Sequence, residues 1–406
     1  MTRRAGTLLS EGASTLAEER VLRFLTAGES HGPALVVVVE GLPAGLPVTI
    51  EDVATELARR RLGLGRGPRM RLERDDVEFT GGVRHGHTLG SPVSLVIHNT
   101  EWPKWQEEMG TAPGTTDKPL RQPRPGHADL VGMQKYGFDD ARNVLERASA
   151  RETAARVAAG SLAKALLSHL DTTVISHVIQ LGKVRASEGR RPLPSDLATV
   201  DESPVRCFDP DAEAAMIAEI EATAKAGDSL GGVVEVLGYG VPPGLGSHVH
   251  WDRRIDGLIA QALMSIQAMK GVEIGDGFAG VARRGSDAHD EILWSEDTHG
   301  YERGSSRAGG IEGGMTTGSL LAARAGMKPL STLNRPVLRT VDVETKEATV
   351  SFKERTDVTA VPASGVVAET MVAFVLASES LRKFGGDSID ELVRNHTAYA
   401  ATLRGP

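Results

Sequence analysis

The apolar positions of this chain fall into short β-branched runs bounded by glycine and proline, and into longer segments with helical spacing. The run ALVVVVE at 34–40 predicts a buried strand, because uninterrupted β-branched residues are typical of strands covered by their neighbours. Further strands are expected at 21–27, at two places within 76–98, and at 172–182. Helical periodicity or alanine-rich composition predicts helices at 51–61, 150–170, 210–226, 255–266 and 360–383.

One pattern of elements occurs twice, at a spacing of roughly 200 residues that is too long for a solenoid repeat. Residues 36–52 and 233–252 each contain a β-branched strand, a Gly-[Leu/Val]-Pro-x-Gly-Leu turn and the beginning of a helix. In the second copy Ile255, Ile259 and Ile266 mark one apolar helical face. This internal repeat predicts a quasi-symmetric fold with one shared core.

The composition argues against several classes of protein, among them nucleic-acid-binding, membrane and disulfide-bonded proteins. The chain has 406 residues and a formal net charge of −8, which argues against general binding to nucleic acid or to membrane surfaces. Cys207 is the only cysteine, so no intramolecular disulfide is possible. No signal peptide is evident, and no apolar run approaches the roughly 20 residues that span a bilayer. We therefore expect a soluble cytoplasmic protein that does not cross a membrane.

Positive charge is concentrated locally despite the acidic balance. Arginine occupies positions 59, 60, 61, 66, 69, 71 and 74, and Gly63, Gly65 and Gly67 lie among them. Guanidinium groups match phosphate and carboxylate geometry, so the segment predicts an anion-binding site. The alternative is a self-neutralising surface turn, because Glu73 and Asp75 follow at once.

A second cationic stretch lies at 121–160. Its first half is rich in proline and glycine and predicts a loop, whereas Ser149 and Glu152 have the spacing of a capping box and predict a helix start. A helix N-terminus favours anions, so Arg147 and Arg151 near that end indicate a negatively charged ligand. The alternative is a solvated basic loop followed by a surface helix.

Other candidate chemistry is spread along the chain. A strand that runs into Gly28–Gly32 would present His31 at a site, although a capped turn with an incidental histidine fits as well. His85 with His87 and His248 with His250 have no third ligand at a familiar spacing, so no metal site is expected. Residues 309–332 contain paired glycines, expected before a short helix, and then Lys328, Ser331 and Thr332. Such residues suit a phosphate, although this is not a Walker A motif.

Eight collinear motifs together resemble the chorismate synthase family. They are GESHG at 28–32, RRRLGLGRGPRM at 59–70, RPGHAD at 124–129, ERASARET at 146–153, SIQAMKGVEIGDGF at 265–278, GGIEGGMTTG at 309–318, KPLST at 328–332 and RTDVTAVPA at 355–363. The resemblance extends from Val21 to about Gly386. It implies a division into an N-terminal extension at 1–20, one catalytic domain at 21–386 and a helical tail at 387–406.

The resemblance implies an α+β fold, a helix–sheet sandwich with two four-stranded antiparallel sheets inside and helices outside, assembled as a homotetramer. It implies a lyase that converts 5-enolpyruvylshikimate 3-phosphate to chorismate and phosphate by 1,4-anti-elimination with reduced FMN. This reaction is the last common step of aromatic amino acid biosynthesis, in the shikimate pathway. NADPH, or a separate flavin reductase, would supply the reduced cofactor.

The family motifs also imply roles for individual residues. His31 would protonate the leaving phosphate, His127 would protonate or hold the reduced flavin, and Asp357 would relay the C6 proton towards flavin N5. Binding of FMN is implied for Arg147, Ala148, Ser149, Gln267, Ala268, Gly313, Lys328, Pro329, Leu330, Ser331, Thr332 and Arg355. Binding of substrate or NADPH is implied for Arg60, Arg66, Arg69, Arg124 and Arg151.

Two other functions are also compatible with anion-binding residues, but the sequence favours them less. A plain NAD(P)H:flavin reductase would also bind FMN, but the sequence has no strand–GxGxxG–helix unit for a Rossmann site. A non-enzymatic protein that binds anions or RNA is disfavoured by the acidic charge balance and the scarcity of aromatic residues.

Overall fold

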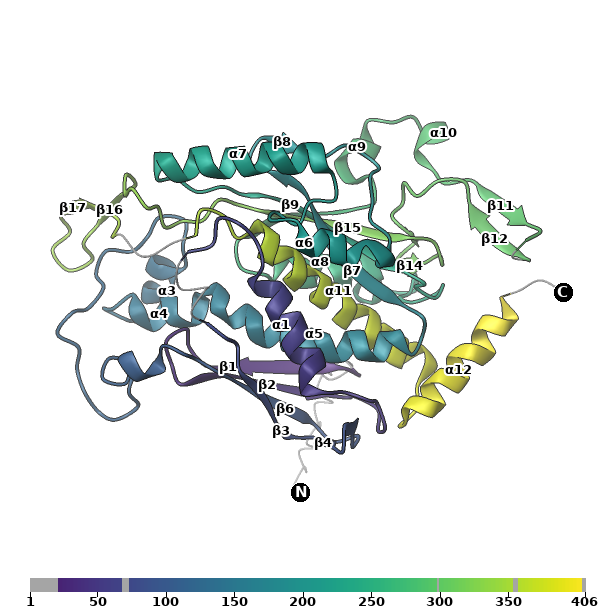
Figure 1. Cartoon of the computed structure of the whole chain (residues 1–406), viewed down its shortest axis with the longest axis horizontal. Coiled ribbons are helices and arrows are strands. Elements are labelled where there is room, and N and C mark those ends of the chain that lie inside the picture. The colour runs from purple at the N-terminus through teal and green to yellow at the C-terminus, as the bar shows by residue number, and fades with distance from the viewer. Residues whose placement is uncertain (1–20, 68–72, 298, 353–356, 404–406) are drawn as a thin grey trace, which may run out of the picture.

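The computed structural model describes residues 21–67, 73–297, 299–352 and 357–403. Within these ranges two antiparallel sheets enclose a layer of long helices (Figure 1). The first sheet has the strand order β1 (Arg23–Ala27), β2 (Ala34–Glu40), β6 (Val93–His98) and β3 (Val77–Gly81). The second has the order β10 (Met269–Ile274), β15 (Leu321–Met327), β9 (Gly232–Tyr239), β7 (Thr173–Leu181) and β8 (Val184–Arg185).

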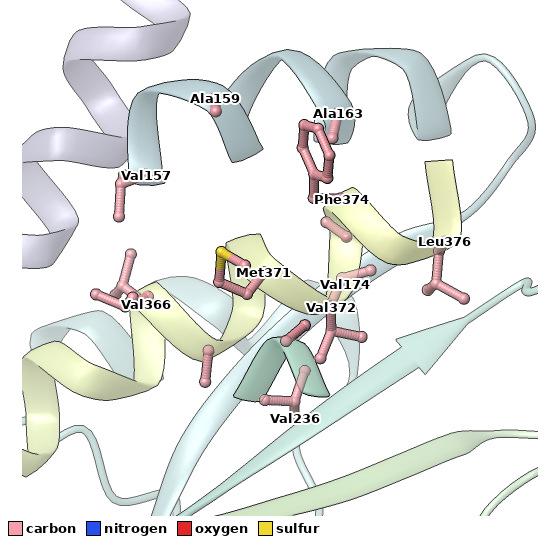
Figure 2. Packing of buried hydrophobic residues seen from close by; sticks show 14 of the residues in the cluster. Val157, Ala159, Ala163, Val174, Val236, Val366, Met371, Val372, Phe374 and Leu376 are labelled. Atoms are coloured by element: carbon pink, nitrogen blue, oxygen red, sulfur yellow. The ribbon is translucent and has the colours of Figure 1, made fainter. Parts of the chain in front are cut away.

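The enclosed layer contains α1 (Ile50–Arg61), α5 (Thr153–Ser168) and α11 (Val361–Phe384). Helix α11 packs on α5 and on strands β7 and β9, while α5 also packs on β2. The rings of Phe24 and Phe374 lie 4.9 Å apart and join β1 to α11. Figure 2 shows α5 side chains above α11, and those of β7 and β9 below it. One apolar core therefore includes both sheets and the helices between them.

Small residues explain why α5 and α11 approach so closely. A Cβ added at Gly160 of α5 would lie 2.3 Å from the Cβ of Thr370 in α11, so only glycine fits at this crossing. Buried residues occur on all sides of α11, alanine and valine foremost among them, which is typical of a helix in the core. By length and composition α11 could span a bilayer, contrary to our expectation from the sequence, but 89% of its most apolar window is buried inside the protein.

The remaining elements surround this core. The helices are α3 (Asp129–Tyr136), α4 (Arg142–Ala148), α6 (Leu197–Glu202), α7 (Pro210–Ala226), α8 (Ile255–Met264), α9 (Gly277–Val281), α10 (Gly285–Ala288) and α12 (Ile389–Thr402). Short 3-10 turns are η1 (Trp102–Lys104), η2 (Ala150–Glu152), η3 (Pro194–Asp196) and η4 (Trp251–Arg253). Small hairpins pair β4 (Val83–Arg84) with β5 (His87–Thr88), β11 (Ile292–Ser295) with β12 (Gly300–Arg303), β13 (Ile311–Glu312) with β14 (Met315–Thr316), and β16 (Arg339–Val341) with β17 (Ala348–Val350).

The α+β class is confirmed, but the predicted layering is wrong. The long helices α5 and α11 lie between the sheets and not outside them, because their apolar residues face both ways. The second sheet has five strands in the described chain, since the two-residue strand β8 extends its edge. The division into an extension, a domain and a tail stays a prediction, and residues 1–20 lie outside the described ranges.

Two local predictions also need correction. The short helix expected after the glycines at 309–314 is instead strand β15, whose backbone pairs with β9 on one side and β10 on the other. The run at 34–40 is a strand, but it is buried on one face only: Val37 is buried and Val38 is 37% exposed. The repeated pattern does fold twice as strand, turn and helix, as β2 with α1 and as β9 with α8.

Candidate active site

A cavity of about 530 Å³ opens between the helix layer and the loops at one end of the molecule. Segments far apart in the sequence form its wall. The residues that line it include Ser30, His31, Arg60, Arg66, Gly67, Glu73, Arg124, Gly126, His127, Ala148, Ser149, Arg151, Thr153, Gln267, Ala268, Lys328, Leu330, Ser331, Thr332 and Asp357.

Two helices begin at this cavity. Ala360 precedes the first turn of α11, and Ser149 precedes the 3-10 turn η2 that leads into α5. The Ser149 hydroxyl accepts a hydrogen bond from the backbone N–H of Arg151 at 3.2 Å. The predicted capping box does not close there, because the Glu152 carboxylate binds Thr26, Arg156 and Gln267 instead. Both helix N-termini direct positive potential towards the cavity.

Two buried arginines share one carboxylate at the base of the cavity. Arg60 Nη2 donates to Asp75 Oδ2 at 3.1 Å, and Arg151 Nη1 donates to Asp75 Oδ1. Burial lowers the pKa of the Arg60 guanidinium to about 10, because Asp75 offsets only part of that effect and the charges of Arg151 and Arg66 add to it. Burial would raise the pKa of Asp75, but the two guanidiniums hold it below its usual value. An anion bound here would find cations that are only partly neutralised.

The loop after α1 brings Arg66 to Asp357. Arg66 Nε lies 3.0 Å from Asp357 Oδ2, and the backbone N–H of Gly67 donates to Asp357 Oδ1 at 2.6 Å. Asp357 comes just before α11, so this contact fastens the glycine-rich loop to the helix end that faces the cavity. Burial lowers the pKa of Arg66 despite the nearby carboxylate.

The RPGHAD motif folds into a compact cluster around a buried carboxylate. Arg124 Nε donates to Asp129 Oδ2 at 2.8 Å, and His127 Nδ1 lies against Asp129 Oδ1. Arg124 Nη1 also donates to Thr332 Oγ1 at 3.2 Å, which joins the cluster to the KPLST loop. Burial would raise the pKa of Asp129, but the bonds from His127 and Arg124 hold it well below its usual range.

His31 also lines the cavity and contacts a carboxylate 115 residues away in the sequence. Its Nδ1 lies 2.8 Å from Glu146 Oε1, and its backbone N–H donates to Glu146 Oε2 at 2.9 Å. Burial would raise the pKa of Glu146, yet the bonds from His31 and the charge of Arg142 hold it below its usual value. The neighbouring Ser30 hydroxyl lies 3.1 Å from that of Ser149. Both predicted acid–base histidines therefore line one cavity, each paired with an ionised carboxylate.

The remaining wall is formed by Gln267, Ala268 and the loop after β15. Ala268 has a φ of +67°, which is uncommon for a residue with a side chain, and its carbonyl accepts from the backbone N–H of Lys328. Lys328 Nζ donates to the Gly126 carbonyl at 2.8 Å. Burial, together with the charge of Lys270, lowers the pKa of Lys328.

Most of the predicted site residues meet in this cavity. The lining includes His31, His127, Asp357, Ala148, Ser149, Gln267, Ala268, Lys328, Leu330, Ser331, Thr332, Arg60, Arg66, Arg124 and Arg151. Arg147 and Pro329 only flank lining residues, and Arg147 donates to the carbonyls of Thr26 and Gly28. Gly313 lies away from the cavity, in the turn of the β13–β14 hairpin. Arg69 and Arg355 lie outside the described residues.

Sequence reasoning missed the carboxylates that organise the site. The sequence pattern around Asp75 indicates at most a neutralising surface turn, yet Asp75 is 3% exposed and accepts hydrogen bonds from two cavity arginines. Glu146 and Glu152 lie in the same motif as Arg147 and Arg151, and Asp129 lies in RPGHAD. Their presence in these motifs is the sequence feature that could have indicated a role in the site. Within the described ranges, no three potential ligands among His, Cys, Asp and Glu gather at one point; the absence of a metal remains a prediction.

Comparisons with known proteins agree with this geometry. The family model described as chorismate synthase matches residues 22–381. A chorismate synthase from Thermobifida fusca is 58% identical over 393 residues, covering 94% of this chain and 99% of the relative. One from Leifsonia xyli is 59% identical over 387 residues, covering 93% of this chain and 96% of the relative. A crystal structure of a chorismate synthase is similar with a TM-score of 0.75 and 41% identity, covering 94% of this chain and 98% of that one. The chain belongs to the chorismate synthase family of lyases, the enzymes that form chorismate.

Proposed function

We propose that this chain converts 5-enolpyruvylshikimate 3-phosphate to chorismate and phosphate by 1,4-anti-elimination, with reduced FMN as cofactor, as the last common step of aromatic amino acid biosynthesis. The observation that carries the proposal is one cavity that contains four arginines, Lys328, two histidines and two helix N-termini. A substrate with a phosphate and two carboxylates needs such a concentration of donors. Each charge-assisted hydrogen bond contributes about 1.5–3 kcal/mol.

Buried polar atoms without a hydrogen-bond partner support a bound polar ligand. In the described chain these atoms include Arg60 Nε, Arg151 Nη2 and Gln267 Oε1, all from residues that line the cavity. Buried polar groups are normally satisfied, so donors and an acceptor left open on one cavity wall fit an anionic cofactor and substrate. Ala148, Ser149 and the loop at 328–332 would hold the flavin, and Arg60, Arg66, Arg124 and Arg151 would hold the substrate.

The acid–base groups fit the proton transfers of an elimination. His31, held by Glu146 through Nδ1, would donate a proton to the departing phosphate. His127, paired with Asp129, would hold a proton next to the flavin ring. Asp357 would take up the proton lost from C6 of the substrate and relay it towards flavin N5. Reduced FMN, when bound, would lend electron density to the allylic centre and recover it, so that no net oxidation occurs.

The source of reduced flavin has two alternatives. Arg60 and Arg66 are the positions implied for NADPH, and both line the cavity that would hold the substrate. NADPH would therefore compete with the substrate for the same guanidiniums if the chain reduces its own flavin. Aerobic consumption of NADPH with FMN present and substrate absent tests this activity; without such consumption, a separate reductase must supply the flavin.

Assembly and location are proposed on surface features. The outer face of the first sheet exposes Leu25, at 76%, and Val38, which supports burial of this face in a homotetramer. The single cysteine, Cys207, is buried and unpaired, which fits a cytoplasmic protein. Light scattering of the purified protein measures the assembly; a monomer at micromolar concentration would contradict it.

The deciding experiment is an anaerobic assay with dithionite-reduced FMN and 5-enolpyruvylshikimate 3-phosphate, in which phosphate and chorismate are measured together. His31→Ala and His127→Ala should each lower kcat by about a hundredfold or more, because general acid–base groups contribute 10²–10⁴. His169→Ala is the matched control, since His169 is an exposed residue at the end of α5. Wild-type rates in both cavity variants would remove the acid–base roles, and absence of chorismate from the wild type would remove the proposed function.

A further inference from the structure

His31 is held from two sides by residues that do not themselves line the cavity. On one side the Glu146 carboxylate lies 2.8 and 3.0 Å from His31 Nδ1 through its two oxygens, and it also accepts the backbone N–H of His31. The Glu146 carbonyl accepts the backbone N–H of Ser30 at 3.0 Å. Three contacts from one residue of α4 thus fix the position of the loop that carries His31.

The other side of the His31 ring is covered by Trp105. The two ring centroids are 4.0 Å apart and the planes differ by 30°, so the rings stack. The Arg142 guanidinium lies 5.1 Å from the centre of the Trp105 ring and donates to Glu146 Oε1 at 3.1 Å. His31, Glu146, Arg142 and Trp105 therefore form a closed set of contacts, which we call the His31 clamp.

The chemistry of the clamp decides which ring nitrogen carries a proton. An ionised carboxylate can only accept hydrogen bonds, so Nδ1 of His31 must be the donor to Glu146. The Nδ1–H tautomer leaves Nε2 as the nitrogen through which His31 can exchange a proton with a ligand. A stacked indole restricts rotation of the ring about its Cβ–Cγ bond.

We infer that Glu146 and Trp105 are positioning residues for the proposed acid His31, with Glu146 selecting the Nδ1–H tautomer and Trp105 fixing the plane of the ring. Neither touches the cavity, so each acts through His31. The inference rests on the proposed acid role of His31, but its structural half, the tautomer and the ring plane, can be measured independently of turnover.

The first test is a nitrogen-15 NMR spectrum of the histidine rings in the ligand-free full-length protein, with the His31 signals assigned by their loss in His31→Gln. The wild type should show the Nδ1–H tautomer for the neutral His31 ring. Glu146→Ala should shift it towards the Nε2–H tautomer, whereas Glu107→Gln, which removes a charge from an exposed residue of the Trp105 loop, should leave it unchanged. An unchanged tautomer in folded Glu146→Ala overturns the inference.

The second test is the steady-state kinetics of Glu146→Gln, which keeps the size of the side chain and removes its charge. We expect kcat to fall about tenfold to a hundredfold, with KM within about twofold, since general acids contribute 10²–10⁴.

The outcomes separate this inference from the proposed function. A rise in KM as large as the fall in kcat, accompanied by a lower melting temperature, would give Glu146 a merely structural role. If Glu146 variants do not fold, Trp105→Leu should lower kcat by about tenfold, and Trp105→Phe should restore most of it because a ring is kept; equal rates in the two would overturn the role of Trp105. If His31→Ala is fully active while Glu146→Ala changes the tautomer, His31 is not the acid. The effect of Glu146 on the His31 ring would still be supported in that case.

Discussion

Adjacent arginines at the end of α1 enter two different buried regions. Arg59 joins a sealed ion cluster, where it donates to Glu369 at 2.6 Å, to Glu56 at 2.7 Å and to Asp201 at 2.7 Å. Arg60 faces the cavity, shares Asp75 with Arg151 and has no hydrogen-bond partner at Nε. Burial opposes the charge in both, but the carboxylates around Arg59 raise its pKa above the ordinary value, whereas the pKa of Arg60 is lowered to about 10.

The difference between Arg59 and Arg60 shows that the number of carboxylates around a buried guanidinium, and not burial alone, decides the direction of its pKa shift. In the sealed cluster the three cations Arg59, Lys164 and Arg206 lie among the carboxylates of Glu369, Glu56 and Asp201. In the cavity, donors are left open in a place that a ligand can reach. Arg59 and Lys164 are paired by carboxylates within the cluster. Arg206 in the same cluster resembles Arg60 instead, because burial lowers its pKa to about 10 and its Nε has no hydrogen-bond partner.

The strongest test of the comparison breaks the sealed cluster. Glu369→Ala leaves Arg59 and Lys164 buried without their shared carboxylate, so the free energy of unfolding should fall by about 3–5 kcal/mol. Urea denaturation measures this change. Glu40→Ala, which removes an exposed partner of Arg23, should cost less than about 1 kcal/mol. Similar losses in the two variants would contradict a special role for the cluster.

Arg60→Gln tests the contribution of the cavity arginine in the comparison of Arg59 with Arg60. Removal of a charge-assisted donor should lower kcat/KM by roughly tenfold to a hundredfold, which corresponds to about 1.5–3 kcal/mol. Stability should change much less than in Glu369→Ala, because Asp75 keeps its bond from Arg151. Steady-state kinetics and urea denaturation of the same preparation measure both quantities. A loss of stability as large as that of Glu369→Ala, with kcat/KM unchanged, would reverse the assignment of the two regions.

The contribution of Asp129 to the free energy of unfolding should depend on pH. Its folded-state pKa is held below the unfolded value, so the unfolded chain binds the proton first as the pH falls. The stability contributed by Asp129 is thus fully present above about pH 5 and is lost as the pH falls through 4 and below. Asp129→Asn should cost about 2 kcal/mol at pH 7, and its difference from the wild type should shrink towards pH 3. A difference that stays constant between pH 7 and pH 3 would show that the carboxylate charge contributes nothing.

The smallest expected effect concerns backbone strain at the cavity wall. Ala268 has a φ of +67°, where glycine has no steric penalty. Ala268→Gly should therefore change the free energy of unfolding by less than about 1 kcal/mol, and towards higher stability, because relief of strain exceeds the entropy gained by the unfolded chain. A melting curve measures it. A clear loss of stability would mean that the Ala268 methyl group packs in a way that outweighs the strain.

Much of the fold was predictable from local pattern. The limits of α7 at Pro210 and Ala226 follow from a proline at the first helical position and a glycine just after the last, and the structure has both. Strand β15 was not predictable, because LAARAGM favours a helix locally and becomes a strand only through pairing with β9 and β10. The position of α5 and α11 between the sheets depends on packing at Gly160 and Thr370, which no sequence period encodes.

The candidate site also has features that the sequence predicts and features that it does not. The sequence by itself determined the chemical inventory: arginines at 60, 66, 124 and 151, histidines at 31 and 127, and motifs collinear with those of one family. Only the tertiary structure decided which cations are paired, since Asp75 and Glu146 reach their partners across 76 and 115 residues. The physical reason is that spacing along the chain reports only local neighbours, whereas the charge state of a buried group depends on whatever the folded chain brings within a few ångströms of it.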